Sequence, residues 1–274
     1  AMQRDAKQGF SPTAISGSDL ALLQYSGGTT GVAKGAMLTH RNLVANLQQV
    51  AALWHSAIEP GREIVITALP LYHIFSLTCN CLLFVHHGGL NVLIANPRDM
   101  PAFLAELARW RFSIISGVNT LYAALLEQPR FARLNFSALK LAVAGGMALH
   151  PSVAANPPAG VRIGTIGVPV PSTDVALRDG DLAVPRGEAG ELCVRGPQVM
   201  HGYWNMPKET AATLDPDGWL RTGDIATLDD YGYLKIVDRK KDMIIVSGFK
   251  VFPNEVEAVL TSHAEVLEAG CVGV

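Results

Sequence analysis

The residues best suited to chemistry lie in one short segment near the N-terminus, which reads YSGGTTGVAKG at positions 25–35. It combines glycines, hydroxyl side chains and one lysine, Lys34, directly after an apolar run. Glycines let backbone N–H groups turn toward a ligand, hydroxyls donate hydrogen bonds to phosphate oxygens, and the lysine supplies positive charge. We therefore expect an anion-binding loop, and the alternative is a glycine-rich turn without a ligand. The segment is not a Walker A loop, because Gly35 follows the lysine where that motif has Ser or Thr.

Alternating apolar runs and helical patterns predict the elements that hold this loop. A strand is expected at 19–25, and Thr39 is expected to cap a helix that runs to Trp54. The apolar face of that helix consists of Leu43, Leu47, Val50 and Leu53. Further strands are expected at 90–95, 112–116 and 139–144, with helices starting at Asp99 and covering 121–127. This alternation predicts an α/β fold, with a layered, mostly parallel sheet and helices on both faces.

The pattern of apolar and turn-forming residues changes after about position 169. Short apolar runs alternate with the turn pairs Asp179-Gly180, Arg186-Gly187, Asp217-Gly218 and Tyr231-Gly232, which is typical of antiparallel hairpins. A last amphipathic helix is expected to begin near Pro253, and the chain then stops within an apolar run, which suggests truncation. We expect an α/β part at 1–168, a small antiparallel β-rich subdomain at 169–238, and a hinge with the start of a small α+β C-terminal domain at 239–274.

One stretch, 64–85, contains no charged residue and is long enough to cross a bilayer. Pro70, His73 and Asn80 interrupt it, and its first part is β-branched and stops at the proline. These features favour a buried strand, loop and helix over a membrane span.

Composition limits the function classes. Of the 274 residues, 49% are hydrophobic and 17% are charged, and the net charge of −2 offers no basic surface for nucleic acid. The four cysteines form neither a CxxC pair nor a zinc spacing, so we expect no metal held by protein ligands alone. The polar N-terminus lacks the pattern of a signal peptide, and a reduced, cytoplasmic location is expected.

Several segments, in order along the chain, resemble the signatures of acyl-adenylate-forming (AMP-binding) enzymes. They are YSGGTTGVAKGAMLTHRN, LPLYHIFSL, AGGM, GWLRTGDI and YLKIVDRKKDMIIVSGFKVFPNEVE. Within that superfamily, the last segment and ALPLYHIFSLTCNCLLF most resemble bacterial long-chain fatty acid–CoA ligases. The resemblance is spread over most of the chain and implies the residue roles and the reaction that follow.

By this resemblance, catalysis is assigned to His73, Lys34 and Lys241. His73 is expected beside the substrate carboxylate and the path of the thiol, and the alternative is a core histidine beside Tyr72 and Phe75. Lys34 is expected on the β- and γ-phosphates of ATP. Lys241 is expected at the hinge about which the C-terminal domain rotates between half-reactions, although charge runs such as 239–241 are often solvated turns.

The resemblance also implies a nucleotide site. Asp224 is expected to accept hydrogen bonds from both ribose hydroxyls, which suits a carboxylate with two oxygens, and its alternative role is that of a turn residue. Arg239 is expected to contact ribose or phosphate, Thr29 to lie near magnesium through the phosphates, and Gly248 and Lys250 to approach coenzyme A. The expected nucleotide-binding set is Ser26, Gly27, Gly28, Thr29, Thr30, Gly31, Lys34, Gly145, Gly146, Met147, Asp224, Ile236 and Arg239.

The implied reaction activates a long- or medium-chain fatty acid in two steps. The carboxylate attacks the α-phosphate of ATP to give acyl-AMP and pyrophosphate, and the thiol of coenzyme A then displaces AMP. Because charge develops on phosphate oxygens, hydrogen-bond donors and Mg²⁺ are needed to stabilise it. The expected cofactors and co-substrates are ATP, Mg²⁺ and coenzyme A. Contact with the inner face of the membrane and a dimeric state are compatible with the resemblance, and nucleic acid is not expected.

The chain departs from the family pattern in ways that keep other functions open. The family's YGxTE signature should follow AGGM, and 147–164 contains no match to it. An N-terminal subdomain and a late lysine of the family are also missing, so we expect this chain to be inactive alone. One alternative is an enzyme that adenylates aryl acids or amino acids, although 74–94 has no acidic residue to meet an ammonium group. The other is a non-catalytic module that binds a nucleotide or an acyl group.

Overall fold

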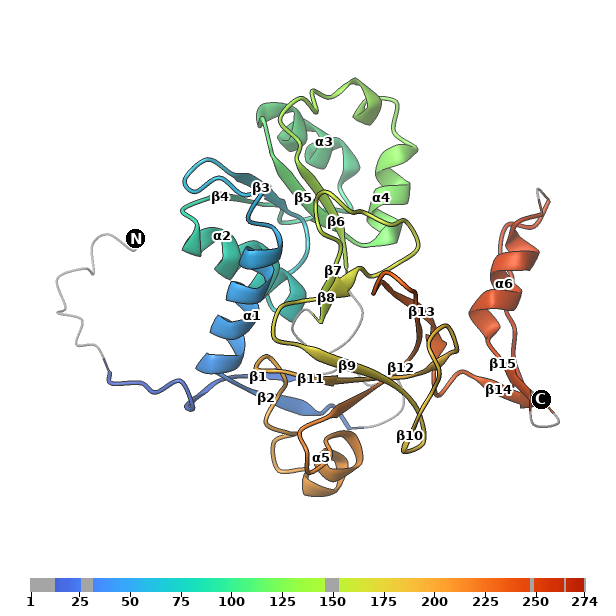
Figure 1. Ribbon diagram of the computed structural model, residues 1–274. Helices are drawn as coiled ribbons and strands as arrows, with labels where there is room; N and C mark the ends of the chain where they lie inside the picture. The colour runs from blue at the N-terminus through green and yellow to red at the C-terminus, as the bar shows by residue number, and fades with distance from the viewer. Residues whose placement is uncertain (1–12, 26–31, 146–152, 247–248, 264, 274) are drawn as a thin grey trace.

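Four parallel strands form the sheet of the N-terminal half, in the spatial order β4-β3-β5-β6 (Figure 1). They are β3 (Ile64–Thr67), β4 (Leu90–Leu93), β5 (Ile114–Gly117) and β6 (Leu141–Ala144). This computed structural model describes residues 13–25, 32–145, 153–246, 249–263 and 265–273. The prediction of a mostly parallel α/β sheet is confirmed, and each expected strand lies within three residues of its place.

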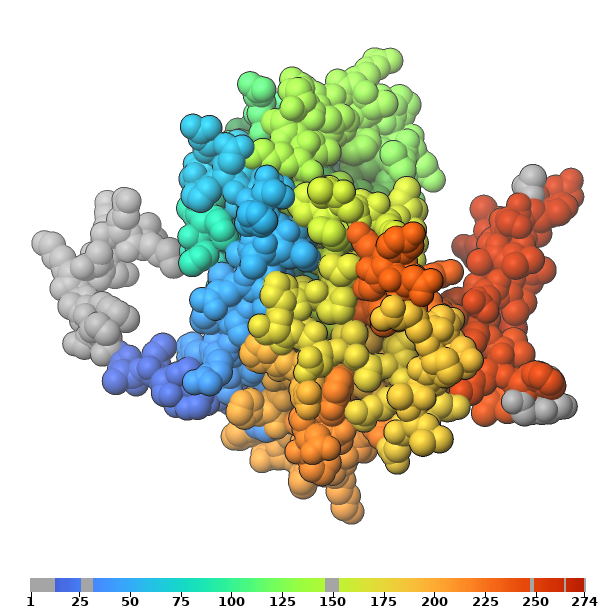
Figure 2. All heavy atoms as spheres, viewed as in Figure 1, coloured from blue at the N-terminus to red at the C-terminus, as the bar shows by residue number. Residues whose placement is uncertain are grey.

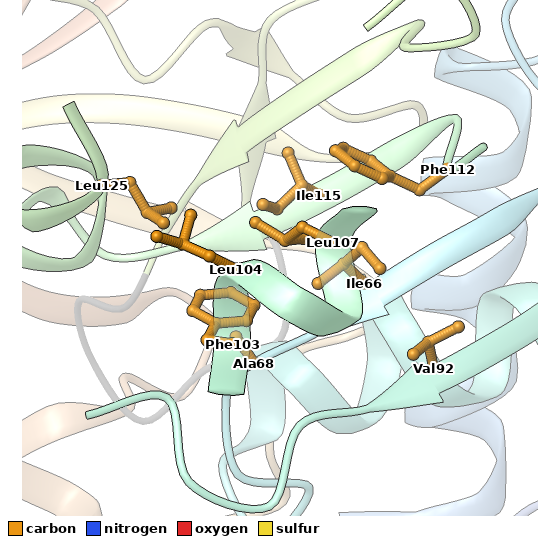
Figure 3. Close-up of a cluster of buried hydrophobic side chains, with 9 residues drawn as sticks. All are labelled: Ile66, Ala68, Val92, Phe103, Leu104, Leu107, Phe112, Ile115 and Leu125. Atoms are coloured by element: carbon orange, nitrogen blue, oxygen red, sulfur yellow. The ribbon is translucent and has the colours of Figure 1, made fainter. Parts of the chain in front are cut away.

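Helices cover both faces of this sheet because side chains alternate along each strand. Val65 and its neighbours on one face pack against α1 (His40–Leu53) and α2 (Leu83–His86). Ile66 and its neighbours on the other face pack against α3 (Met100–Arg109) and α4 (Asn119–Leu126). Figure 3 shows this second cluster, in which Leu107 of α3 lies beside Ile66 and Phe103 of α3 lies beside Ala68.

The uncharged stretch 64–85 folds as a strand, a turn and a helix, as the sequence predicts. After β3, the helix passes through a π-helical section, Ser76–Leu82, before it continues as α2. Ser76, Thr78 and Asn80 are buried there and donate hydrogen bonds to nearby oxygens, so the polar side chains of the stretch are satisfied inside the protein. Among the residues that the structure describes, no helix is long and apolar enough to cross a membrane.

The second sheet has five antiparallel strands in the order β10-β9-β11-β12-β13. They are β9 (Asp174–Asp179), β10 (Leu182–Ala183), β11 (Gly190–Arg195), β12 (Leu220–Leu228) and β13 (Leu234–Arg239), with α5 (Pro207–Thr213) between β11 and β12. The turn pairs behave as predicted, since their glycines, Gly180, Gly187, Gly218 and Gly232, all have positive φ. The antiparallel, β-rich second part is therefore confirmed.

The passage between the two sheets is short and closely packed. β7 (Ala154–Ala155) pairs with β8 (Val168–Pro169), and the intervening residues form a small loop. The Arg162 guanidinium lies 4.1 Å from the ring centre of Tyr231 and 4.5 Å from that of Tyr233, and it pairs with Asp229 at 2.6 Å. The Trp54 indole donates to the Asn156 carbonyl at 3.2 Å. These contacts fix the loop to α1 on one side and to the β-rich sheet on the other.

The C-terminal residues form a hairpin and a helix that project from the rest of the molecule (Figure 2). The hairpin consists of β14 (Ile244–Val246) and β15 (Phe249–Val251), and α6 (Pro253–Thr261) follows. The predicted start of the last helix at Pro253 is confirmed. Asp238 at the end of β13 accepts hydrogen bonds from the backbone N–H and the side-chain amide of Asn254, both at 3.0 Å, which joins α6 to the sheet.

Two features near the N-terminus were not expected from the sequence. The segment before the predicted cap forms a further strand, β2 (Gly35–Thr39), which pairs with β1 (Leu20–Tyr25). Thr39 caps α1 as predicted, through a reciprocal pair of hydrogen bonds with Asn42. The most buried face of α1 is not wholly apolar, however, because Asn42, Asn46 and Gln49 are buried alongside Val50.

Candidate functional site

The two ends of the predicted anion-binding loop are held next to each other by the β1–β2 hairpin. Tyr25 and Gly35 are opposite each other in the ladder, and a Cβ atom on Gly35 would lie 3.2 Å from the Tyr25 ring. The other edge of β2 is bonded to 201–204, where the Trp204 N–H donates to the Gly35 carbonyl at 2.8 Å. The Lys34 ammonium lies 5.4 Å from the centre of the Tyr203 ring. The loop residues Ser26, Gly27, Gly28, Thr29, Thr30 and Gly31 lie outside the described residues.

Asp224 is a buried carboxylate on β12, directly opposite Arg239 on β13. The Arg239 Nε atom lies 2.8 Å from Asp224 Oδ1, which is an ion pair, but its N–H is not aligned with that oxygen. No other described group donates a hydrogen bond to Oδ1 either. Burial raises the pKa of Asp224, and the charge of Arg239 offsets this only in part. A buried carboxylate with an oxygen free to accept suits a ligand that brings its own hydroxyl donors.

An open depression lies next to Gly223, the residue before Asp224. It is lined by Gly223, Arg239, Lys240 and Lys241, so three cationic side chains border it. Gly223 has a φ of +74°, and its carbonyl accepts from the Lys240 N–H at 2.8 Å, which turns the chain at the edge of the depression. The structure thus brings together an acceptor for a diol and positive charge for phosphate. Of the residues predicted for the site, Arg239 and Lys241 line this depression, and Asp224 pairs with Arg239.

Phe75 lies next to both His73 and Gly145, the glycine that follows β6. A Cβ atom on Gly145 would lie 2.8 Å from the Phe75 ring, closer than real Cβ contacts, so any side chain at this position would force the ring to shift. The Phe75 N–H donates to His73 Nδ1 at 3.3 Å, and burial lowers the pKa of His73. The imidazole is therefore neutral at pH 7, with its proton assigned to Nε2. Gly146 and Met147 lie outside the described residues.

Tyr122 supports this region and was missed by the sequence analysis. Its hydroxyl lies 2.9 Å from the Val143 carbonyl and 3.1 Å from the Ile115 carbonyl, so it joins β6 to β5 close to the carboxyl ends of both strands. Burial raises its pKa, which keeps it protonated as a donor. No local signal could have revealed this role, because a tyrosine within a short amphipathic helix is usually a core residue.

Two other predicted residues occupy different surroundings. Ile236 lies opposite Ala226 in the β12–β13 ladder and packs against the apolar cluster of the β-rich sheet. The Lys250 ammonium is 2.7 Å from a carboxylate oxygen of Asp179, next to a pocket between the C-terminal hairpin and β9. Lys250 lowers the pKa of Asp179. Gly248, predicted near coenzyme A, lies outside the described residues.

A family model described as "AMP-binding enzyme" matches the chain in two pieces, residues 2–156 and 153–204. The break between the pieces coincides with the region where the YGxTE signature is missing. The matched residues include the N-terminal glycine-rich loop, the parallel sheet and the first strands of the β-rich sheet.

Curated relatives agree with this match over the whole chain. A "Long-chain-fatty-acid--CoA ligase" of Salmonella typhimurium (strain LT2) is 50% identical over 301 residues, covering 100% of this chain and 54% of the relative. A protein of the same name from Escherichia coli O6:H1 is 53% identical and covers 93% of this chain and 50% of the relative. The chain spans about half the length of the curated relatives it matches. The Salmonella alignment runs over 301 residues although the chain has 274, so the relative carries residues that this chain lacks.

Solved structures show the same fold. The o-succinylbenzoate CoA synthetase of Bacillus subtilis, solved with its acyl-adenylate intermediate, superposes with a TM-score of 0.82 at 28% identity. The superposition covers 94% of this chain and 57% of the synthetase. The arrangement of a parallel sheet, an antiparallel sheet and a C-terminal extension is thus common to this chain and an enzyme that forms an adenylate.

Proposed function

The chain belongs to the AMP-binding enzyme family, and from that premise we propose that it contributes the nucleotide site of an ATP-dependent fatty acid–CoA ligase. The proposed enzyme converts a long- or medium-chain fatty acid to its acyl-adenylate and then to its coenzyme A thioester. Identity of 50% to long-chain fatty acid–CoA ligases across the chain supports this substrate class. The activity and substrates of the whole protein are part of this proposal. So is the division of the chain into an α/β part (1–168), a β-rich subdomain (169–238) and a hinge with the start of a C-terminal domain (239–274).

The observation that carries the proposal is the environment of Asp224. Its buried Oδ1 accepts no aligned hydrogen bond from the described residues, and it pairs with Arg239, which borders a depression together with Lys240 and Lys241. A ribose diol would satisfy the carboxylate with two donated hydrogen bonds, and a neighbouring phosphate would meet the cationic side chains. A nucleotide presents both groups within one molecule, so the site is complementary to AMP or ATP.

The other residues have roles that follow from their chemistry. Lys34 and the hydroxyls of Thr29 and Thr30 would hold the β- and γ-phosphates, which leave together as pyrophosphate. Burial lowers the pKa of His73 and favours its neutral form, which can position the substrate carboxylate by donating a hydrogen bond from Nε2. Lys250 would have to leave Asp179 before it could bind a phosphate of coenzyme A.

Magnesium is proposed as a companion of ATP rather than as an ion held by this chain. No group of three or more His, Cys, Asp or Glu side chains among the described residues could hold a metal ion. Thr29 offers a single hydroxyl, so the nucleotide phosphates themselves would supply most of the oxygen ligands. We also propose a cytoplasmic location with contact at the inner face of the membrane, where a fatty acid substrate would be met.

The test is pyrophosphate exchange, measured with an intact protein of the relatives' length that contains this chain. Palmitate, benzoate and a set of amino acids are compared as acids. We expect exchange with palmitate, and exchange only with benzoate or an amino acid would contradict the fatty acid assignment. The 274-residue chain alone should form no acyl-CoA, and product formation by it would refute that expectation.

A non-catalytic nucleotide-binding module is the second candidate, favoured by the missing YGxTE signature at 147–164. Binding of ATP without exchange for any acid would support the module over the ligase. Equilibrium dialysis with labelled ATP, run beside the exchange assay, separates these two outcomes.

A further inference from the structure

Helix α1 buries a row of amide side chains that the proposed chemistry does not use. Asn42, Asn46 and Gln49 are four and three residues apart, so they lie on one face of the helix, and each is at most 5% exposed. Burying an amide is unfavourable unless its hydrogen bonds are made inside the protein. An apolar face would have packed at no such cost, which suggests that these side chains are kept for the contacts they make.

Gln49 is bonded to two separate loops of the β-rich part. Its Nε2 atom lies 2.7 Å from the Pro171 carbonyl, 3.1 Å from Gln198 Oε1 and 3.3 Å from Thr173 Oγ1. Gln198 closes the network by donating to Thr173 Oγ1 at 2.8 Å. Gln198 is itself only 1% exposed, so the network is shielded from water and its hydrogen bonds are correspondingly strong.

Asn42 makes an equivalent connection on the same face, about two helical turns closer to the N-terminus. Its Nδ2 atom donates to the Pro197 carbonyl at 2.7 Å and to the Val199 carbonyl at 2.9 Å. Its Oδ1 accepts from the backbone N–H and the hydroxyl of Thr39, both at 2.9 Å. One side chain therefore joins the end of β2, the start of α1 and the segment after β11.

The loops that receive these bonds have backbone geometry adapted to them. Ser172 has a φ of +59°, which is uncommon for a residue other than glycine, and it follows the Pro171 carbonyl that accepts from Gln49. Gly196 lies against the side-chain oxygen of Gln198, where a Cβ atom would overlap it. Ser172 thus has an uncommon backbone conformation next to one acceptor, and Gly196 leaves room for the Gln198 side chain.

The network connects the two parts that carry the proposed nucleotide contacts. α1 follows β2 directly, and β2 begins one residue after Lys34. The segments that contact α1 lead into β9 and out of β11, and β11 pairs with β12, which carries Asp224. We propose that Gln49 and Asn42 are positioning residues that fix the distance between the phosphate contacts at Lys34 and the ribose contact at Asp224. This inference rests on the proposed function.

The consequence is specific to ligands that reach both contacts. ATP carries a ribose and a triphosphate, so its second contact forms at a high effective concentration once the first is made. AMP lacks the terminal phosphates, and pyrophosphate lacks the ribose, so neither depends on the distance between Lys34 and Asp224. A change in that distance should therefore weaken ATP far more than the other two ligands.

The test compares the affinities of ATP, AMP and pyrophosphate for the intact protein carrying Gln49→Leu, which removes the amide at nearly constant size. We expect the affinity for ATP to fall about tenfold and the other two to stay within about twofold. Val50→Ala is the matched control, because it weakens α1 packing in the apolar cluster and should lower the Tm without selective loss of ATP. Equal losses for ATP and AMP, or unchanged ATP affinity, would overturn the positioning role.

A second variant keeps the test decisive if Gln49→Leu does not fold. Thr173→Val removes the hydroxyl on the other side of the network and should reproduce the selective loss of ATP affinity. A wild-type protein that binds none of the three ligands would overturn both the proposed function and this inference. A wild type that binds all three, with variants that weaken them equally, would overturn the positioning role alone.

Discussion

The hydrogen bonds of Asp238 predict that this residue stabilises the N-terminus of the C-terminal helix, α6. It is 2% exposed, and Oδ1 accepts from the Arg239 N–H at 2.7 Å and from the side-chain amide of Asn254 at 3.0 Å. Oδ2 accepts from the Asn254 backbone N–H at 3.0 Å, in the first turn of α6. The residue before α6, Phe252, provides no side-chain cap. Asp238 therefore serves as the cap from the preceding strand.

The substitution Asp238→Asn tests this role with little change of shape. An asparagine keeps one oxygen and replaces the other with an NH₂ group, which would face an N–H donor. The loss of one buried hydrogen bond to a charged acceptor is worth about 1.5–3 kcal/mol. Losing the negative charge at a helix N-terminus adds about 0.3–1 kcal/mol. The sum, about 2–4 kcal/mol, corresponds to local opening that is about 30-fold or more frequent.

Amide hydrogen exchange measures that opening directly. We expect faster exchange at Arg239, at Asn254 and through the first turn of α6, with no change in β3 and β5. Asp179→Asn is the control, because it breaks the exposed ion pair with Lys250 and should leave α6 exchange as in the wild type. Uniformly faster exchange across the parallel sheet, or unchanged exchange at α6, would show that Asp238 does not cap the helix.

Three further predictions follow from the site and its supports. Asp224→Asn should raise the Tm of the ligand-free protein at pH 7, because burial raises the pKa of that carboxyl and its ionisation therefore lowers stability. This gain in Tm should shrink at acid pH, where the carboxyl is protonated in both the folded and the unfolded protein. The same substitution should abolish AMP binding, measured by calorimetry. Glu63→Gln should reduce the free energy of unfolding by about 2 kcal/mol in urea titrations, because buried Glu63 pairs with the partly exposed Lys140 at 2.8 Å. Hydrogen bonds, chiefly from Lys140, lower the pKa of Glu63 despite its burial, so the difference should be present at neutral pH and disappear on acidification through that lowered pKa. Gly145→Ala should displace the Phe75 ring, cost about 1–3 kcal/mol and weaken nucleotide binding, and Phe75→Leu in the same chain should restore part of both.

Most helices and strands could be predicted from the sequence because residues that are neighbours in the chain determine where each one begins and ends. Thr39 can be recognised as a cap, and the glycines of the turn pairs as turn formers, from neighbouring residues alone. The apolar runs of β3 and β5 likewise identify strands buried on both faces. β2 was missed because Gly35–Thr39 is short and lies between a glycine-rich loop and a helix cap, two signals that favour irregular structure.

The site was predictable only as far as the family signatures extend. They named Arg239 and Lys241, which line one depression, and Asp224, which pairs with Arg239. The amide row of α1 could not be found in this way, because the partners of Gln49 lie 122 to 149 residues further along the chain. Asp238 is similar, since its role as a cap becomes visible only once α6 is placed against β13.

The segment that connects the two sheets, formed by β7, β8 and the loop between them, indicates where proteins of this fold can differ in length. Ala155 and Val168 are paired neighbours, so the loop between β7 and β8 leaves and returns at nearly the same point. The family match breaks at 153–156, beside this pair. Additional residues inserted there need only close a longer loop, whose entropic cost rises slowly with length. Segments can therefore be gained or lost at this place while the parallel and antiparallel cores, and the contacts between them, keep their geometry.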